Sequence, residues 1–170
     1  MIELRPYARP DHAAVRALFI AVNRALAPPE MRDTFEHYIE RSLAEEIDRI
    51  DAYYAEHEGR FMISVRNGQF VGMFGLEMSG PEGMELRRMY VAPGARRSGI
   101  GRFMLRHAEN LAQSSGARRL VLSTTELQPE ALALYRTSGF TQTKVDIALA
   151  ATNKTVGSGI RRYHFEKWLN

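Results

Sequence analysis

The chain has 170 residues, of which 45% are hydrophobic and 25% are charged, and these proportions are typical of globular proteins. The length suits one compact domain spanning residues 1–170, because no repeat or linker divides the chain. No run of about 18 apolar residues is present, the N-terminal residues are too polar for a signal peptide, and there is no cysteine. We therefore expect no membrane association, no disulfide and no thiolate metal site, in keeping with a cytoplasmic location.

The formal net charge is +3, but the charges are unevenly distributed. Acidic residues are concentrated between positions 36 and 58, whereas a short central region is basic. A local basic cluster can bind a small polyanion as well as nucleic acid. No basic motif is interleaved with aromatic residues, so we expect no nucleic-acid partner. The basic cluster consists of Arg87, Arg88, Arg96, Arg97, Arg102 and Arg106.

The N-terminal third begins with a strand pattern and continues with two helical patterns. Residues 2–7 alternate in polarity and predict a short strand, and apolar residues at helical spacing then predict a helix from about Pro10 to Pro28. A second apolar stripe predicts one long amphipathic helix over residues 35–57, with Gly59 as its stop. That stripe consists of Phe35, Tyr38, Ile39, Leu43, Ile47, Ile50 and Tyr54.

The rest of the chain is predicted to be mostly strands around one central helix. Residues 61–66 and 69–77 flank Asn67-Gly68, which is the strongest short signal for a β-hairpin. Residues 84–92 form the next predicted strand, and apolar spacing then predicts a helix from residue 100 to about residue 116. The elements predicted after it are strand 119–123, helix 129–137, strand 140–149, a loop over 150–159 and strand 160–169.

The most informative segment joins a strand to a helix through a turn that contains glycines. The strand ends at Ala92-Pro93, the turn carries Gly99 and Gly101, and the predicted helix follows at once. The first N–H groups of a helix have no partner inside the helix and lie at the positive end of its dipole. They can bind a diphosphate without a metal ion, and glycines let the anion approach the backbone closely. We therefore expect the backbone of residues 97–102 to bind such an anion.

Two other phosphate-binding motifs do not fit this turn. A Walker A motif requires Lys and then Ser or Thr after its last glycine, but Gly101 is followed by Arg102. A dinucleotide-binding fingerprint requires a third glycine at the position of Met104. An ordinary strand-to-helix turn, in which the glycines serve only close packing, remains an alternative.

Two blocks of the sequence resemble the GNAT superfamily of acyltransferases. The first block is Arg96-x-x-Gly99-x-Gly101, after a strand that ends at Pro93, and it is similar to the family's acetyl-CoA signature. The second block, residues 128–140, reads Gln-Pro-Glu-Ala-Leu-Ala-Leu-Tyr-Arg-Thr-Ser-Gly-Phe and resembles the family's Asn-x-x-Ala-x-x-Leu-Tyr-x-x-x-Gly-Phe. The resemblance extends over nearly the whole chain.

This resemblance implies an α/β fold with a mixed, mostly antiparallel sheet of seven strands, splayed between the fourth and fifth strands and flanked by about four helices. It also implies an enzyme that transfers an acetyl group from acetyl-CoA directly to a primary amine without a metal. The acceptor would be a small-molecule amine, an amino acid or an amino-acid conjugate, and a homodimer is allowed. A peptide or protein acetyltransferase and a non-catalytic acetyl-CoA-binding module are the alternatives. More loosely, Phe35-x-x-Tyr38-Ile39 and Tyr53-Tyr54 are similar to the camello and cysteine-S-conjugate acetyltransferase branch.

The resemblance also assigns residues to the cofactor. The strand segment from Met89 to Val91 would hydrogen-bond the pantetheine arm along the edge that the splay frees, and residues 97–102 would bind the diphosphate. The family's asparagine corresponds to Gln128, which keeps an amide side chain. The expected cofactor-binding residues are Met89, Tyr90, Val91, Arg96, Arg97, Ser98, Gly99, Ile100, Gly101, Arg102, Gln128 and Tyr135.

Acetyl transfer to an amine has three chemical requirements. The amine must lose a proton, since alkylammonium groups have a pKa near ~10.4, the developing oxyanion needs a donor and the departing thiolate needs an acid. By the resemblance, Tyr135 would be the acid and the backbone N–H of Met89 the oxyanion donor. Glu85 matches the base of the histone acetyltransferase branch, and the superfamily's other carboxylate position corresponds to Ser123. A core aromatic and an exposed structural glutamate are the alternative interpretations of Tyr135 and Glu85. Other candidates for the base are Glu77, Glu126 or a chain of water molecules.

The remaining polar residues suggest no further chemistry. The five histidines show no ligand-like spacing, so no metal site is expected, and His107 is expected to be packed or half-exposed. The resemblance implies that the predicted long helix borders the acceptor pocket, so Tyr38, Tyr53 and Tyr54 are candidates for its wall. The acidic residues of the predicted long helix are expected to form a solvated face rather than to attract a cationic amine. They are Glu36, Glu40, Glu45, Glu46, Asp48 and Asp51.

Overall fold

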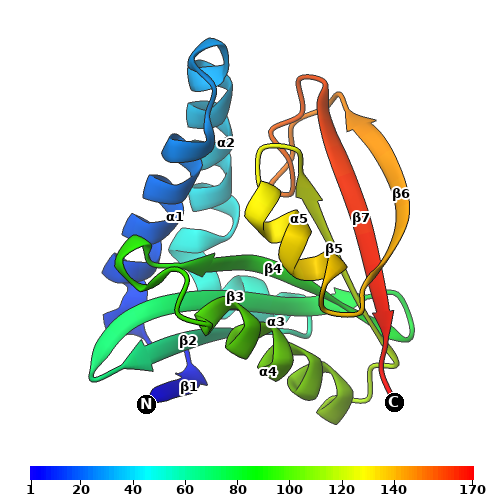
Figure 1. The fold of residues 1–170 in the computed structure, drawn as a ribbon. Coiled ribbons are helices and arrows are strands. Elements are labelled where there is room, and N and C mark those ends of the chain that lie inside the picture. Colours follow the sequence, from blue (N-terminus) through cyan, green and yellow to red (C-terminus); the bar gives the residue numbers. More distant parts are fainter.

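The computed structural model describes all 170 residues and contains a seven-stranded sheet with the order β1-β2-β3-β4-β5-β7-β6 (Figure 1). Neighbouring strands are antiparallel except β4 and β5, which are parallel, so the predicted mixed sheet is confirmed. The elements in chain order are β1 (Ile2–Pro6), α1 (His12–Leu26), α2 (Arg32–Glu45), α3 (Ile50–Glu56), β2 (Arg60–Arg66), β3 (Gln69–Ser79), β4 (Gly83–Val91), α4 (Ile100–Ser114), β5 (Arg119–Thr125), α5 (Pro129–Arg136), β6 (Thr141–Ala148) and β7 (Ile160–Trp168).

The sheet opens between β4 and β5. These two strands pair only where Gly83–Glu85 lies beside Arg119–Val121, although β4 continues to Val91 and β5 to Thr125. In Figure 1, β1 to β4 lie across the lower part of the molecule, whereas β5, β7 and β6 rise steeply from them. The predicted splay between the fourth and fifth strands is confirmed, and it leaves one edge of β4 without a strand partner.

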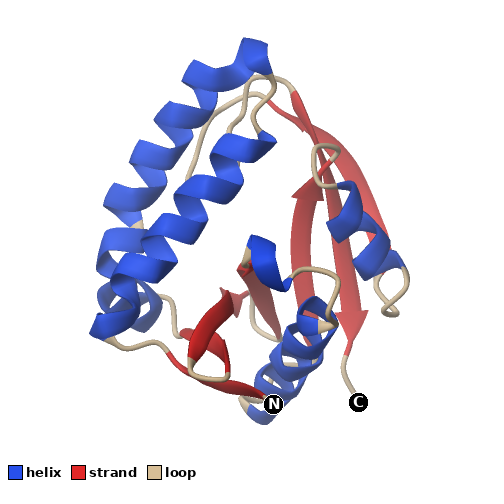
Figure 2. Cartoon of the chain, turned by 60° about the vertical axis from the view of Figure 1, so that its left-hand side comes forward, coloured by secondary structure: helices blue, strands red, loops and turns tan.

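Helices cover both faces of the sheet. Figure 2 shows α1 and α2 side by side on one side of the sheet, with α4 and α5 on the other. Each side has its own buried core, with 17 residues under α1 to α3 and 18 residues under α4 and α5, so neither face is left bare. Consecutive side chains of β3 point into the two cores alternately: Met73 belongs to the core under α1 to α3, and Phe74 belongs to the core under α4 and α5.

The single long helix predicted over residues 35–57 is wrong. Helix α2 ends at Glu45, a 3-10 turn spans Ile47–Arg49, and α3 begins at Ile50. The break occurs at Glu46, whose φ and ψ of −139° and −62° are not helical and whose carboxylate is fully buried. This carboxylate accepts hydrogen bonds from the Arg88 guanidinium, so the helix break coincides with a buried ion pair. The structure has five α-helices where the resemblance implied about four, because α2 and α3 are separate.

A β-bulge interrupts β4 beside the opening. Met73 of β3 lies opposite Tyr90, but Gly75 lies opposite Arg87, so two residues of β4 face a single residue of β3. Arg88, inside the bulge, has a φ of 54°, which is unusual for a residue other than glycine. Successive side chains of a regular strand point to opposite faces, and the bulge cancels this alternation. As a result, Arg87 and Arg88 point to the same side of the sheet.

Candidate active site

A groove of about 560 Å³ lies where β4 and β5 diverge. Its walls are the end of β4, the turn before α4 together with the first residues of that helix, and helix α5. The volume falls in the range of roughly 300–1,000 Å³ that small-molecule and cofactor sites occupy. Of the residues predicted to bind the cofactor, only Ser98 is absent from the lining. Those that line the groove are Met89, Tyr90, Val91, Arg96, Arg97, Gly99, Ile100, Gly101, Arg102, Gln128 and Tyr135.

The turn before α4 presents a row of unpaired backbone donors. None of the six N–H groups from Arg97 to Arg102 donates to a protein atom, and Phe103 is the next residue to do so, through a bond to Gly99 O at 3.0 Å. Gly99 adopts the left-handed conformation, with a φ of 82°, which glycine takes without steric cost. These free donors at the positive end of the α4 dipole match the acceptor oxygens of a diphosphate. The residues present therefore fit the diphosphate of CoA.

The predicted basic cluster is divided by the fold. Arg96, Arg97 and Arg102 are exposed around the turn. Arg87 and Arg88 are buried on the side of the sheet that faces α1 to α3, where carboxylates neutralise them. Of the six arginines in the cluster, only Arg96, Arg97 and Arg102 line the groove.

The edge of β4 that faces the opening carries free backbone groups. Ala92 N–H donates to Val71 O of β3 at 2.8 Å, so the N–H of the preceding residue, Val91, faces the opposite edge. Met89 lies two residues before Val91, beside the bulge, and it lines the groove. Since β5 pairs with β4 only as far as Glu85, the Val91 N–H points into the opening between the two strands.

Tyr135 of α5 is buried against aromatic side chains at the inner end of the groove. Its ring packs edge-on against Phe140, with centroids 5.8 Å apart, and lies 6.0 Å from Phe165. Burial raises the pKa of the Tyr135 hydroxyl above its ordinary value, so the phenol stays protonated at neutral pH. Tyr135 is thus both part of the core and part of the groove lining.

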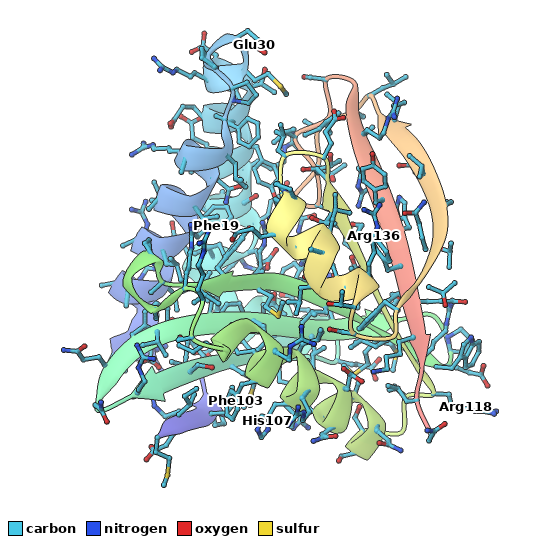
Figure 3. All side chains as sticks on the ribbon, viewed as in Figure 1. Phe19, Glu30, Phe103, His107, Arg118 and Arg136 are labelled. Atoms are coloured by element: carbon cyan, nitrogen blue, oxygen red, sulfur yellow. The ribbon has the colours of Figure 1, made fainter.

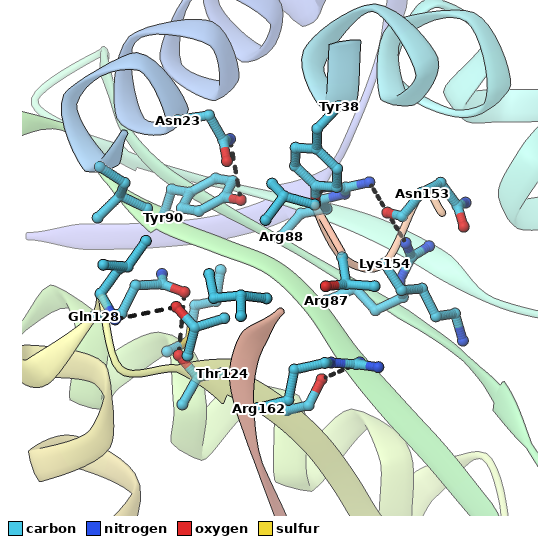
Figure 4. A pocket seen from close by; sticks show the side chains of 18 of the residues that line it. Asn23, Tyr38, Arg87, Arg88, Tyr90, Thr124, Gln128, Asn153, Lys154 and Arg162 are labelled. Atoms are coloured by element: carbon cyan, nitrogen blue, oxygen red, sulfur yellow. Dashed lines mark hydrogen bonds between the residues drawn. The ribbon is translucent and has the colours of Figure 1, made fainter. Parts of the chain in front are cut away.

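A second, smaller cavity of about 120 Å³ continues from the groove toward α1 and α2 (Figure 4). Residues of β4, β5, β7 and the loop before β7 line it. The cavity and the groove share part of their lining, so they meet inside the opened sheet. The shared residues are Leu26, Met89, Tyr90, Leu127, Gln128 and Tyr135.

A buried cluster of opposite charges lies on the wall of this central cavity. Glu46 Oε1 is 2.9 Å from Arg87 Nη1 and 3.0 Å from Arg88 Nη2, and Glu77 Oε1 is 3.3 Å from Arg87 Nε. Burial opposes the ionisation of Glu46, but Arg88 and Arg87 outweigh it and hold its pKa below the ordinary value. The sequence predicted that Glu46 lies on a solvated helix face. This prediction is wrong, because Glu46 is buried. We refer to Glu46, Glu77, Arg87 and Arg88 as the Arg–Glu cluster.

Three tyrosines surround the Arg–Glu cluster. Tyr54 donates to Glu46 Oε2 at 2.7 Å, whereas Tyr38 and Tyr53 accept hydrogen bonds from the two arginines at 2.7 and 2.6 Å. Burial raises the pKa of Tyr53 to about 12. Of the three tyrosines that the sequence offered as walls of the acceptor pocket, only Tyr38 lines the central cavity.

The loop before β7 forms one side of the central cavity. Asn153 O accepts hydrogen bonds from Arg88 and Arg87 at 2.6 and 3.1 Å, and Figure 4 shows Asn153 and Lys154 beside the two arginines. Lys154 Nζ lies 2.6 Å from Glu85 Oε1, and the Glu85 side chain is 14% exposed. Glu85 therefore lines the cavity and is already paired with a cation.

Comparison with known proteins assigns the chain to a family. A model of the acetyltransferase (GNAT) family matches residues 23–140, which is more than half of the chain. The chain belongs to the GNAT acetyltransferase family. The resemblance seen in the sequence is confirmed, and the GNAT family generally uses acetyl-CoA.

Curated GNAT relatives match part of the chain. N-acetyltransferase family 8 member 3 of Rattus norvegicus is 38% identical over 96 residues, which cover 54% of this chain and 42% of that protein. IAA acetyltransferase of Azospirillum brasilense is 35% identical over 113 residues, which cover 58% of this chain and 74% of that protein. The chain thus spans about half or less of the length of its family 8 relatives. A GNAT acetyltransferase structure from Staphylococcus aureus Mu50 covers 100% of both chains with a TM-score of 0.77 at 17% identity, and shows the same fold.

Features outside the groove and the cavity add no further GNAT site residue. Figure 3 shows Phe103 and His107 on the outer side of α4, and their ring centroids are 4.4 Å apart, as expected for a packed histidine. No group of three or more His, Cys, Asp or Glu side chains is placed to hold a metal ion. None of the helices combines the length and the apolar character needed to cross a membrane.

The sequence analysis missed three residues of the central cavity. Asn23 of α1 donates to Tyr90 Oη at 3.5 Å, Lys154 pairs with Glu85, and Arg162 of β7 donates to Ser123 Oγ at 2.8 Å. Strand alternation places Arg162 on the same face as Ile160, a buried residue, and this was the one available signal. The pairing of β7 with β5, which brings Arg162 to Ser123, cannot be derived from local sequence.

Proposed function

We propose that the chain is an acetyl-CoA-dependent N-acetyltransferase whose acceptor is a primary amine of a small molecule. One observation carries the proposal: the groove that fits the cofactor opens into a polar cavity inside the sheet, at Tyr90 and Tyr135. Acetyl-CoA in the groove and an amine in the cavity can therefore meet inside the protein, where the two spaces join. Such positioning supplies much of the rate enhancement in acyl transfer.

Acetyl-CoA, when bound, supplies a thioester whose carbonyl carbon is attacked by the amine. In the proposed assignment, the free N–H groups of residues 97–102 hold its diphosphate and the β4 edge at Val91 holds its pantetheine arm. The N–H of Met89 donates to the oxygen atom on which negative charge develops. This bond is stronger in the transition state than in the ground state, and therefore favours reaction.

The remaining task is to move protons. The acceptor arrives as an ammonium ion and must lose a proton before it can attack, and we assign this step to Glu85. Tyr135 donates a hydrogen bond to the departing sulfur. Because burial raises the pKa of Tyr135, complete transfer of its proton to a thiolate with a pKa near ~8.5 is uphill. Stabilisation of the charge on sulfur is therefore its larger contribution.

The shape of the central cavity supports a small acceptor. Its volume is about 120 Å³, and the loop that contains Asn153 forms part of its lining. That loop is held by two buried guanidinium groups, Arg87 and Arg88, which resist displacement. A small amine needs only the cavity, whereas a polypeptide acceptor would also need room for the chain on both sides of the reacting residue.

A panel of acceptors tests the proposal. The purified chain is incubated with acetyl-CoA and with amines, amino acids, amino-acid conjugates or peptides, and release of the free CoA thiol is measured. We expect thiol release with small amines and a thermal shift with CoA alone. Turnover of peptides only would instead show a peptide acetyltransferase. A thermal shift with CoA but no turnover of any acceptor would show a non-catalytic binding module.

A further inference from the structure

Arg162 of β7 lines the central cavity and has no carboxylate partner. Its guanidinium donates to Ser123 Oγ at 2.8 Å, and no Asp or Glu oxygen lies within 4.0 Å of it. The carboxylate of its cross-strand neighbour, Asp146, is instead bound by His164 at 3.1 Å and by Lys144 at 3.7 Å. A guanidinium carries several N–H donors in a rigid fork, and most of those on Arg162 remain free.

Every other basic side chain of the cavity is neutralised. The Arg–Glu cluster pairs Arg87 and Arg88 with two carboxylates, and Lys154 Nζ lies 2.6 Å from Glu85 Oε1 and 3.2 Å from Glu77 Oε1. The four basic groups lining the cavity thus face three carboxylates, and one positive charge is left over. That charge belongs to Arg162, because it alone lacks an ion pair.

An uncompensated charge in a half-buried site calls for a ligand of opposite charge. Removing a guanidinium from water is costly unless an anion with suitable hydrogen-bond acceptors replaces the lost hydration. The fork of an arginine fits the two oxygens of a carboxylate, which can accept two parallel hydrogen bonds. Ser123 Oγ, on the adjacent strand β5, already orients the guanidinium at the edge of the cavity.

The positive charge and the carboxylate proposed as the base lie on different walls. Arg162 lies opposite Thr125, at the end of β5 where the sheet is open, whereas Glu85 is the last residue of β4 that pairs with β5. An acceptor that spans the cavity can therefore present an amine to one wall and an anion to the other. A simple alkylamine would leave Arg162 unpaired.

We propose that the acceptor is a zwitterion, an amine that also carries a carboxylate, and that Arg162 binds this carboxylate. The inference rests on the function proposed above and specifies its substrate class. Arg162 acts here as a specificity-determining residue. It contacts the part of the acceptor that does not react.

Matched acceptors test this inference. Each α-amino acid in the panel is paired with the amine that lacks its carboxylate, for example phenylalanine with 2-phenylethylamine. We expect the wild-type chain to acetylate the amino acid with a kcat/KM at least about tenfold higher, because a hydrogen bond to a charged group contributes roughly 1.5–3 kcal/mol. A preference for the plain amine would overturn the inference and leave the proposed acetyltransferase standing.

Two variants locate the effect. Arg162→Met should raise KM for the amino acid about tenfold or more, remove most of the preference for the amino acid over the plain amine and leave KM for acetyl-CoA unchanged, and Arg162→Lys should restore part of the loss. The control is Arg161→Met, an exposed neighbour on the same strand. Equal losses on both acceptors of a pair, with an unchanged thermal midpoint, would contradict a role in carboxylate binding. A wild-type chain that turns over no acceptor would contradict the proposed function as well.

Discussion

The guanidinium groups of Arg87 and Arg88 lie on the same side of β4, although the two residues are consecutive in the strand. The bulge at Arg88 makes this possible, and both side chains reach Glu46 Oε1, at 2.9 and 3.0 Å. Both also donate to Asn153 O, in the loop before β7. The bulge in β4 therefore allows two neighbouring arginines to contact both Glu46, at the break between α2 and α3, and the loop that lines the central cavity.

The first prediction concerns the stability that Glu46 provides. Glu46→Gln removes one of the two carboxylates that neutralise Arg87 and Arg88, and leaves buried positive charge. Breaking a buried ion pair in this way costs about 3–5 kcal/mol, so we expect the free energy of unfolding at pH 7, measured with urea, to fall by about that amount. The control is Glu45→Gln, whose side chain is 48% exposed and lies 3.6 Å from Arg41, and which should cost below about 1 kcal/mol.

The same variant should change how stability depends on pH. The pKa of Glu46 is lower in the folded chain than in the unfolded chain, so its contribution is complete above the unfolded value of about 4.3 and is lost as the pH falls toward the folded value. The stability difference between wild type and Glu46→Gln should therefore shrink in acid. A difference that stayed constant from pH 7 to pH 2 would show that the charge of Glu46 is not what stabilises the fold.

The break at Glu46 could not have been predicted from the sequence. Leu43, Ile47 and Ile50 keep helical spacing through the 3-10 turn, so the apolar pattern continues where the helix does not. The partner of Glu46 at the break is Arg88, 42 residues away in the chain, which becomes a neighbour only when β4 is in place. Charge partners of this kind follow from tertiary structure rather than from local pattern.

The turn before α4 could be predicted because its chemistry is local. The left-handed Gly99, the free N–H groups and the helix that follows all lie within one short segment. The same holds for Tyr135, whose motif includes the short helix that carries it. Arg162 was missed because its significance depends on Ser123 and on the absence of a carboxylate nearby, and neither can be derived from neighbouring residues.

A second prediction separates anion binding from close packing at Gly101. A Cβ atom added there would lie 3.7 Å from Leu134 Cδ2 and 3.9 Å from Val91 Cγ2, which are ordinary contacts. Alanine also favours a helix over glycine by up to about 1 kcal/mol. We expect Gly101→Ala to keep or slightly raise the thermal midpoint and to weaken CoA binding at least about tenfold by calorimetric titration, because the methyl group enters the groove.

The control for Gly101 is a glycine of the same turn outside the groove. Gly94→Ala has no atom within 4 Å of the new methyl group, and we expect unchanged CoA affinity. Equal CoA affinity in the wild type and in Gly101→Ala would favour the alternative interpretation from the sequence, in which this glycine serves close packing of the turn and not anion binding.

A third prediction concerns Glu85 as the base. A carboxylate accepts a proton only when it is ionised, so the activity of the wild type should fall as the pH is lowered through the pKa of the base. Glu85→Gln should lower kcat/KM by about 10²-fold or more and remove this acid limb of the pH–rate profile. Glu126→Gln, at an exposed position outside the cavity, should leave the profile unchanged. An acid limb that survives in Glu85→Gln would contradict the role of Glu85 as the base and move that role to another of the candidates named from the sequence.

The fourth prediction tests whether Tyr135 acts through its hydroxyl or only through its ring. Tyr135→Phe keeps the edge-on contact with Phe140, so the thermal midpoint and CoA affinity should change little. Loss of the donor to the departing sulfur should lower kcat by roughly 10²-fold, within the usual range for a single positioned proton donor. Tyr163→Phe provides a matched control, because Tyr163 packs on the same core but lines neither the groove nor the cavity. Unchanged kcat in Tyr135→Phe, with CoA still bound, would show that Tyr135 serves only as an aromatic residue of the core. Stabilisation of the departing sulfur would then belong to another group.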